Sequence, residues 1–310
     1  MKIIVTGGTG LVGTAIKSIK GNYNHEFLFL SSKDCDLTNY EETLTFFENN
    51  KPDYVIHLAA CVGGLYKNMN HKVEMLEKNL QINFNVLKSC HEVKVKKCVS
   101  CLSTCIFPDK TTYPINEEML HDGPPHSSND AYAYAKRMLE IQSKAYQEQY
   151  GDNFICVIPT SIYGPNDNFN LEDSHVIPGL IHKCFLSQME KKDFVVRGTG
   201  NPLRQFIHSE DLAKLIMWTL LEYNEKSPII LSVGEEDEVS IRDIAIYIAR
   251  VYGYEEHLVF DPSYSDGQYK KTADNSKLVS YINNFKFKNI ELGIEETVKW
   301  FIQNYENCRK

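Results

Sequence analysis

Short apolar runs that are rich in β-branched and aromatic residues alternate with amphipathic stretches along the first half of the chain. Runs of this length and composition are typical of buried strands. They are KIIVT (2–6), EFLFL (26–30), DYVIHL (53–58), KKCVS (96–100) and FICVIPT (154–160). The stretches between them have the apolar spacing of helices and lie at 11–20, 40–49, about 73–93 and 132–150. Regular alternation of strand and helix predicts an α/β fold, in which helices cover both faces of a parallel sheet.

After Gly164 the alternation becomes less regular. The sequence predicts helices near 176–186 and at 209–223, strands at FVVRG (194–198) and PIILSVG (228–234), and a Ser-capped helix that begins at Ser240. We therefore expect a doubly wound sheet domain, formed by residues 1–163 and about 192–230. A smaller α/β domain that binds the substrate is expected from about 164–191 and 231–310.

The segment GGTGLVG (7–13) directly follows the first predicted strand and opens the first predicted helix. It satisfies G-x-x-G-x-x-G through Gly7, Gly10 and Gly13. Glycines allow the backbone to approach a pyrophosphate, and the helix N-terminus supplies N–H donors and positive potential. The segment therefore predicts a dinucleotide cofactor bound to a Rossmann-type sheet.

The end of the second strand indicates which dinucleotide is bound. FLSSKD (29–34) places Ser31, Ser32 and Lys33 where a site selective for NAD would carry its carboxylate. Two hydroxyls and a cation suit a ribose 2′-phosphate better, and we therefore expect NADP(H). The alternative is that Lys33 is an ordinary surface lysine.

AYAYAKRM (131–138) contains Tyr132 and Lys136, four residues apart on one face of a predicted helix. A nearby ammonium group favours the tyrosinate, so we expect the pKa of Tyr132 to be lowered for proton exchange. Tyr134 has Met138, and not a lysine, four residues on. The spacing alone is common on amphipathic helices, but Ser103 follows the fourth strand, and the carboxyl ends of parallel strands line the ligand crevice.

Composition excludes several classes of protein. The apolar fraction of 43% and the charged fraction of 24% are those of a soluble globular protein, and a net charge of −8 provides no basic field for nucleic acid or anionic membranes. No apolar run approaches the roughly 18 residues that span a bilayer, and the N-terminus lacks the features of a signal peptide. Nine scattered cysteines do not form a disulfide framework. We expect a cytoplasmic protein with reduced thiols.

With GGTGLVG, HLAA (57–60), Ser103, Tyr132 and Lys136 in this order, the chain resembles the extended short-chain dehydrogenase/reductase family. The finer pattern is similar to the branch of that family that epimerises and reduces a GDP-linked 4-keto-6-deoxy sugar. The matching segments are AACVGG (59–64), STCIFPDKTTYP (103–114), PTSIYGPNDNFN (159–170), SHVIPGLIHK (174–183), RGTGNPLRQF (197–206) and SDGQYKK (265–271).

The resemblance implies an NADP(H)-dependent enzyme that epimerises GDP-4-keto-6-deoxy-D-mannose at carbons 3 and 5 and reduces it at carbon 4. Related dehydratases carry Asp-Glu after the Ser-Thr pair, whereas this chain has Cys105-Ile106. Cys105 and His175 would exchange protons at carbon, since their free pKa values lie near 8.5 and 6.5. Ser103 and Tyr132 would polarise the carbonyl oxygen. The implied catalytic residues are Ser103, Cys105, Tyr132, Lys136 and His175.

The resemblance also implies two sets of binding residues. Those expected to bind the cofactor are Gly7, Gly10, Leu11, Val12, Gly13, Lys33, Asp36, Leu37, Tyr132, Lys136, Pro159, Ser161, Ile162 and His175. Those expected to bind the GDP group are Lys183, Arg197, Arg204 and Asp266. Arg197 replaces a tryptophan that is common in the family, and an arginine can stack on a base or pair with phosphate.

The stretch KCVSCLSTCIFP (97–108) contains three cysteines, two of them in a C-x-x-C. On a strand, residues i and i+3 point to opposite faces, so Cys98 and Cys101 cannot readily bind one metal ion. We expect both to be buried hydrophobic side chains, Cys105 to face the crevice, and the protein to hold no metal. The family resemblance further implies a homodimer built from the helices near 73–93 and 132–150.

Two other functions remain open from the sequence. One is a different NADP-dependent nucleotide-sugar epimerase or reductase of the same fold, although Cys105 with His175 disfavours a simple 4-epimerase. The other is a non-catalytic NADP-binding sensor. The presence of Ser103, Tyr132 and Lys136 together disfavours the sensor.

Overall fold

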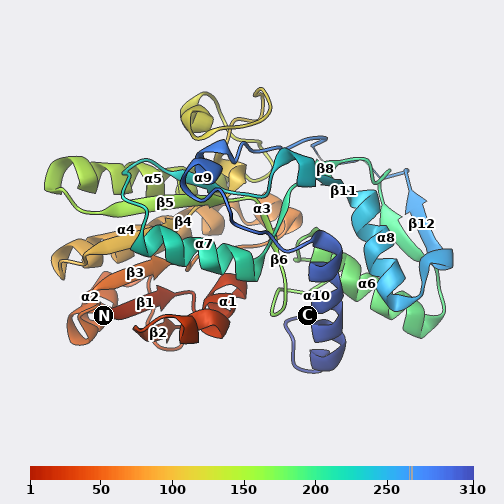
Figure 1. The fold of residues 1–310 in the computed structure, drawn as a ribbon, viewed down its shortest axis with the longest axis horizontal. Helices are drawn as coiled ribbons and strands as arrows, with labels where there is room; N and C mark the ends of the chain where they lie inside the picture. Colours follow the sequence, from red (N-terminus) through yellow and green to blue (C-terminus); the bar gives the residue numbers. More distant parts are fainter. Residues whose placement is uncertain (265, 267) are drawn as a thin grey trace.

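A six-stranded parallel sheet forms the centre of the larger part of the protein (Figure 1). The computed structural model describes residues 1–264, 266 and 268–310, without the side chains of Leu65 and Tyr66. The strand order is β10-β5-β4-β3-β1-β2, and every neighbouring pair is parallel. The strands are β1 (Lys2–Thr6), β2 (Glu26–Leu30), β3 (Tyr54–His57), β4 (Lys97–Cys101), β5 (Phe154–Pro159) and β10 (Ile229–Leu231). The predicted parallel α/β fold is confirmed.

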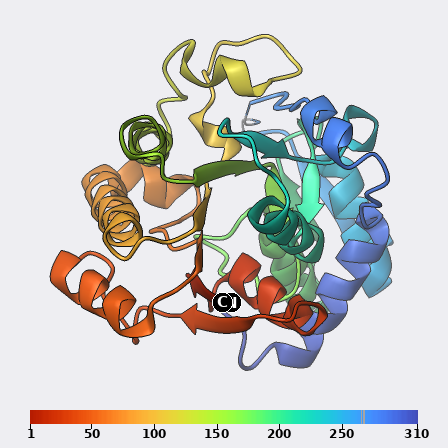
Figure 2. The same cartoon turned by 60° about the vertical axis from the view of Figure 1, so that its left-hand side comes forward.

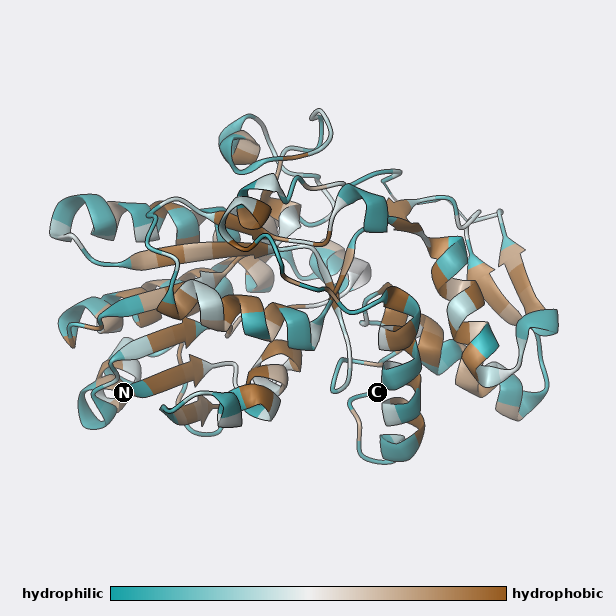
Figure 3. Cartoon of the chain, in the orientation of Figure 1, coloured by the Kyte–Doolittle hydropathy of each residue, from teal (hydrophilic) through white to brown (hydrophobic). Residues whose placement is uncertain are grey.

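Helices cover both faces of the sheet (Figure 2). One face packs against α2 (Tyr40–Asn50), α4 (Lys72–Glu92) and α5 (Asp130–Tyr150), and the other packs against α1 (Leu11–Ile19) and α7 (Ser209–Leu221). Side chains alternate along each strand, so that Ile4 belongs to the first core and its neighbours Ile3 and Val5 belong to the second. Both sides of every central strand are therefore buried, which explains the unbroken apolar runs (Figure 3).

The order in which strands are added to the sheet reverses at β1, because β2 lies on one side of β1 and β3 lies on the other. In open parallel sheets ligands bind at such a switch point, beyond the carboxyl ends of the strands. The ends of β1, β3, β4 and β5 all lie at this edge of the sheet. They carry the Gly7–Gly13 turn, the 58–64 segment, Ser103 and the Pro159–Ile162 segment.

A second part of the molecule has its own apolar core (Figure 1). It contains α6 (Val176–Glu190), α8 (Ile241–Tyr252), α10 (Ile290–Asn304) and the parallel pair β7 (Phe194–Arg197) and β12 (Leu258–Asp261). Helix α8 begins at the predicted cap, where the Ser240 Oγ accepts a 3.0 Å hydrogen bond from the Asp243 N–H. The strand predicted at 194–198 therefore pairs within the second part.

Short elements complete the fold. Not all of them join the two parts, since Lys20–Asn22 links α1 to β2 and Glu255–His257 links α8 to β12. The short elements are α3 (Leu65–Asn70), α9 (Ser276–Tyr281), β6 (Ser161–Tyr163) paired with β9 (Phe206–His208), β8 (Leu203–Arg204) paired with β11 (Val239–Ser240), and the 3-10 turns Lys20–Asn22, Thr104–Ile106, Glu117–His121, Glu235–Asp237 and Glu255–His257. Among the described residues, no helix combines the length and the apolar character needed to cross a membrane.

Candidate active site

Glycines build the turn between β1 and α1. Gly7 has a φ of +66°, and a Cβ atom there would lie 2.8 Å from the backbone nitrogen of Ala59. A Cβ atom on Gly13 would lie 2.5 Å from the carbonyl oxygen of Gly7. Gly10 directly precedes α1, so the helix N-terminus meets the carboxyl end of β1. This close approach leaves backbone N–H groups and the positive end of the helix dipole available to a pyrophosphate.

The loop after β2 contains the residues expected to distinguish NADP from NAD. Lys33 is exposed. The next residue, Asp34, turns back, and its Oδ2 accepts hydrogen bonds from the Ser31 N–H and Oγ at 2.8 and 2.5 Å. These hydrogen bonds lower the pKa of Asp34 and occupy its carboxylate. Asp36 likewise accepts from the Thr38 N–H and Oγ1, so Lys33 is the cation that this loop presents.

Tyr132 and Lys136 lie on the first turns of α5, as the spacing predicts. The Lys136 Nζ atom lies 5.9 Å from the centre of the Tyr132 ring and donates a 2.8 Å hydrogen bond to the Cys101 carbonyl at the end of β4. The Ser103 Oγ lies 3.5 Å from the Cys105 N–H. The end of β4 and the start of α5 thus bring the hydroxyl, phenol and ammonium groups to one place.

The expectation that the pKa of Tyr132 is lowered is wrong in this structure. Burial raises that pKa well above its usual value, and the nearby thiols of Cys105, Cys101 and Cys61 raise it further. Burial also lowers the pKa of Lys136. Spacing on a helix could predict that the ammonium lies near the phenol, but it could not predict that both are desolvated. A phenol that keeps its proton at neutral pH is suited to donate it.

Cys105 is half-buried beside this group. Cys98 and Cys101 pack against opposite cores; Cys98 is buried, as expected, whereas Cys101 is only half-buried. Burial raises the pKa of the Cys105 thiol, and Ser103 and the ammonium groups of Lys271 and Lys136 oppose that increase.

Lys271, which the sequence reasoning missed as a site residue, therefore lies within electrostatic reach of Cys105. Arg204 lies within reach of Lys271, because its charge contributes to lowering the pKa of that lysine. The Arg204 guanidinium also donates a 2.7 Å hydrogen bond to the Gln268 carbonyl oxygen. The Cys105 thiol, the Tyr132 phenol and three cations, Lys136, Lys271 and Arg204, thus form one cluster.

The remaining residues expected to bind the GDP group form a neighbouring set. Burial and the charge of Arg197 lower the pKa of Lys183. The Arg197 guanidinium lies 4.6 Å from the centre of the Tyr264 ring. The Asp266 carboxylate accepts hydrogen bonds from the Thr199 N–H and Oγ1 at 2.9 and 2.6 Å. Ser265 and Gly267, in the same matching segment, lie outside the described residues.

His175 directly precedes α6 and is accessible to solvent. Its pKa is nevertheless lowered by desolvation, and the carboxylate of Asp173 acts in the opposite direction. Lys183 follows two turns further along the same helix. Helix α6 therefore carries one expected catalytic residue and one expected substrate-binding residue. The pair expected to exchange protons, Cys105 and His175, thus comes from two different parts of the molecule.

Residues 3–234 match a protein family described as the NAD dependent epimerase/dehydratase family. The chain belongs to this family. The resemblance to extended short-chain dehydrogenases/reductases is thereby confirmed, and the glycine turn, Tyr132, Lys136 and Ser103 occupy the edge of the sheet where the family's cofactor-binding fold places a ligand.

Within the epimerase/dehydratase family, the chain is similar along its full length to a smaller group of proteins. The chain is 56% identical to GDP-L-fucose synthase from Dictyostelium discoideum, over 99% of this chain and 97% of that protein. It is 50% identical to a probable GDP-L-fucose synthase from Drosophila melanogaster, over 100% and 99%. The crystal structure of a GDP-L-fucose synthetase from Naegleria fowleri bound to NADP superimposes with a TM-score of 0.96 at 50% identity, covering 100% of this chain and 95% of that one.

Other residues expected to bind the cofactor lie at the same edge of the sheet. Leu11 and Val12 begin α1, and Leu37 is a buried residue of the 31–38 loop. Pro159 ends β5 and is buried, and Ser161 and Ile162 follow it in half-buried positions. Within the described ranges, no cluster of three or more His, Cys, Asp or Glu side chains could hold a metal ion.

Proposed function

We propose that the chain is a bifunctional sugar-nucleotide enzyme that converts GDP-4-keto-6-deoxy-D-mannose into GDP-L-fucose. It would epimerise the sugar at carbons 3 and 5 and then reduce carbon 4 with NADPH. Full-length relatives at 50% and 56% identity that are named for this product support the proposal. The observation that carries it is the half-buried Cys105 thiol beside Tyr132 and Lys136, within electrostatic reach of Lys271.

The described residues fit NADP(H). The Gly7–Gly13 turn would hold the pyrophosphate, and Lys33 with Ser32 would contact the 2′-phosphate. Leu11, Val12, Asp36, Leu37, Pro159, Ser161 and Ile162 would line the remainder of the cofactor site, together with Tyr132, Lys136 and His175. When bound, NADPH supplies the hydride for carbon 4. The Naegleria fowleri protein binds NADP in its crystal structure, which supports this choice of cofactor.

The chemistry of epimerisation assigns roles to the remaining residues. A ketone at carbon 4 acidifies the hydrogens at carbons 3 and 5, and inversion needs a base on one face and an acid on the other. The charges of Lys271 and Lys136 favour the thiolate of Cys105. His175 would then supply the proton on the opposite face, while Ser103 and Tyr132 stabilise the enolate oxygen. Once the ketone has re-formed and carbon 4 has received the hydride, Tyr132, which retains its phenolic proton, would protonate the carbon-4 oxygen.

The cations of the second part of the chain would bind the GDP group. Arg204, Lys271 and Lys183 suit the diphosphate, since arginine and lysine form charge-assisted hydrogen bonds with phosphate. Asp266 could accept hydrogen bonds from guanine or ribose. Arg197 already lies over Tyr264, and the two side chains together could stack on the base in place of the family's tryptophan.

The test is the oxidation of NADPH, followed by absorbance, with GDP-4-keto-6-deoxymannose and with its UDP and dTDP analogues. We expect turnover with the GDP sugar and at least about a hundredfold lower kcat/KM with the other two, because a site that hydrogen-bonds one base leaves polar groups unpaired with another. Equal turnover of the three nucleotide sugars would contradict the assignment of GDP.

Assembly, location and domain division complete the proposal. The homodimer would use α4 and α5, which pack side by side and expose Phe84 on α4 and Tyr134, Met138 and Ile141 on α5. The last three recur at i, i+4 and i+7 and therefore share one helix face. A cytoplasmic location remains a proposal. The division into 1–163 with about 192–230 and a smaller domain of the remaining residues is also a proposal, although β7, at 194–197, pairs with β12 of the smaller domain.

A further inference from the structure

The segment Cys61–Gly64, which follows β3, is fixed at both ends. At one end, the Cys61 N–H donates to the Asn79 Oδ1 and the Asn79 Nδ2 donates to the Cys61 carbonyl, both at 2.9 Å. At the other end, the Gly64 N–H donates to the Oδ1 of Asp173 at 2.8 Å and to its carbonyl oxygen at 3.1 Å. We call this second contact the Asp173–Gly64 latch. It joins residues 109 positions apart in the sequence.

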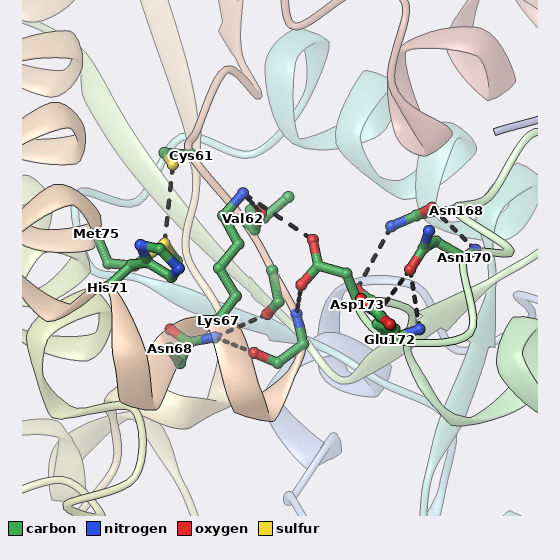
Figure 4. Close-up of polar contacts among 12 residues, drawn as sticks. Cys61, Val62, Lys67, Asn68, His71, Met75, Asn168, Asn170, Glu172 and Asp173 are labelled. Atoms are coloured by element: carbon green, nitrogen blue, oxygen red, sulfur yellow. Dashed lines mark hydrogen bonds and ion pairs between the residues drawn. The ribbon is translucent and has the colours of Figure 1, made fainter. Parts of the chain in front are cut away.

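Side chains of the 168–173 loop hold Asp173 firmly (Figure 4). The Asn170 Oδ1 accepts hydrogen bonds from the N–H groups of Glu172 and Asp173 at 2.9 and 3.0 Å. The Asn168 Nδ2 donates to the Asp173 carbonyl at 3.4 Å, and the Lys67 Nζ lies 4.0 Å from the Asp173 Oδ2. The carboxylate therefore approaches Gly64 from a turn that is closed by hydrogen bonds of its own asparagine side chains.

Glycine at position 64 is needed for its small size. Its φ of −65° suits any residue. A Cβ atom there, however, would lie 3.2 Å from the carbonyl carbon and oxygen of Asp173. Contacts this short require the neighbouring atoms to move by a few tenths of an ångström, and the neighbours here are backbone.

The Cys61–Gly64 segment and its latch lie between His175, the proposed proton donor at carbon, and Tyr132, which holds the carbonyl group. Asp173 stands two residues before His175, and its charge favours the protonated imidazole. At the other end of the segment, Cys61 lies close enough to Tyr132 to influence its pKa. The segment therefore spans the distance between the phenol that polarises the carbonyl group and the imidazole that serves the neighbouring carbon.

We propose that Asp173 is a positioning residue for epimerisation, because its latch to Gly64 sets the distance between His175 and the carbonyl group held by Ser103 and Tyr132. This proposal rests on the proposed function. A displacement of about an ångström can cost a hundredfold in rate. Loss of the latch should therefore impair proton exchange at carbon far more than NADPH binding, since His175 is only one of many residues proposed to contact the cofactor.

The experiment measures deuterium incorporation at carbons 3 and 5 of GDP-4-keto-6-deoxymannose in heavy water with NADP⁺ present and NADPH absent. NADPH affinity is measured by fluorescence titration. Asp173→Ala should slow incorporation at least about tenfold and change NADPH affinity far less. Asp173→Asn keeps an oxygen that can accept from the Gly64 N–H and should restore incorporation to within about threefold of the unmodified rate, since the latch and not the charge carries the effect.

Two further variants test the latch from its other side. Gly64→Ala should slow incorporation because its Cβ atom pushes the two loops apart, whereas a Cβ atom on Gly21 meets nothing within 4 Å, so Gly21→Ala should have no effect. Glu172→Gln removes the adjacent carboxylate, whose side chain forms no hydrogen bond within the described part of the chain, and should also have no effect. These variants keep the test decisive if Asp173→Ala does not fold.

Amide exchange by mass spectrometry reports on the latch without any substrate. The peptide that contains Gly64 should exchange faster in Asp173→Ala than in the unmodified protein and Asp173→Asn. Unchanged amide exchange, or equal losses of incorporation in the Ala and Asn variants, would overturn the proposal, as would a parallel loss of NADPH affinity. Failure of the unmodified protein to incorporate deuterium would overturn the proposed function instead, and leaves the amide-exchange test of the latch standing.

Discussion

The substitution Gly13→Ala tests the proposed cofactor turn where its packing is tightest. The added Cβ atom would lie 2.5 Å from the Gly7 carbonyl oxygen and 2.7 Å from the Cα and carbonyl carbon of Gly8. Ordinary van der Waals contact begins near 3.4 Å. The overlap is therefore close to an ångström, and it falls on backbone atoms that cannot rotate away.

Two opposing effects determine how much Gly13→Ala changes stability and NADPH affinity. Alanine favours a helix over glycine by about 1 kcal/mol, which alone would stabilise α1. Relief of an overpacked contact by backbone movement costs about 1–3 kcal/mol, and here it displaces the N–H groups that should face the pyrophosphate. We expect the steric cost to dominate and to appear mainly in binding, with NADPH affinity reduced at least about tenfold, which corresponds to about 1.4 kcal/mol.

Calorimetric titration of NADPH provides the measurement, and circular dichroism verifies that the variant is folded. Gly21→Ala is the matched control, because it makes the same substitution on the surface with no atom within 4 Å, and its affinity should equal that of the unmodified protein. If Gly13→Ala binds NADPH as tightly as the unmodified protein, the turn does not hold the pyrophosphate.

Further predictions concern the proton donor, the thiol and a buried lysine. Tyr132→Phe should bind NADPH normally but reduce turnover at least about a hundredfold, because only the phenolic proton is lost; undiminished turnover would make the tyrosine structural. Cys105→Ser should nearly abolish deuterium incorporation at carbons 3 and 5, because a hydroxyl ionises far above neutral pH, whereas Cys98→Ser should lower stability only; normal incorporation by Cys105→Ser would remove the thiol from the mechanism. Lys97 is buried and donates a 2.6 Å hydrogen bond to the Thr219 carbonyl oxygen, and burial lowers its pKa to about 8. An unfolded lysine titrates near 10.4, so the folded state releases this proton first, and the free energy of unfolding should gain up to about 1.4 kcal/mol per pH unit from this group between pH 8 and 10. Urea unfolding at pH 8 and 9.5 should show this gain in the unmodified protein relative to Lys97→Met, and equal pH dependence of the two would contradict the assignment.

The sequence predicted the sheet because its central strands are buried on both faces and therefore appear as unbroken apolar runs. It also predicted that Cys98 and Cys101 point to opposite faces, since that follows from the period of a strand. Tyr132 and Lys136 could be paired because four residues separate them on one helix. These are local relations, and local spacing is sufficient to predict them.

Other features depend on how distant segments pack, and spacing could not predict them. The pKa of Tyr132 is raised because the fold buries the phenol. Lys271 reaches Cys105 from a segment far along the chain. The only sequence signal for this role is that Lys270 and Lys271 stand close to Asp266, which was itself expected to bind the substrate. The turn that occupies the Asp34 carboxylate depends on the conformation of the loop after β2. The contact of Gly64 with Asp173 likewise exists only in the folded chain.

The central claim is that the protein exchanges protons at carbons 3 and 5 before it reduces carbon 4. Analysis of the product made in heavy water tests this claim most directly. The protein is incubated with GDP-4-keto-6-deoxymannose and NADPH, and the sugar nucleotide formed is examined by NMR and mass spectrometry. Proton exchange before reduction predicts GDP-L-fucose with deuterium at carbons 3 and 5 and one NADPH oxidised per molecule formed. A reduced sugar that keeps the original configuration at carbons 3 and 5 and contains no deuterium would contradict the account.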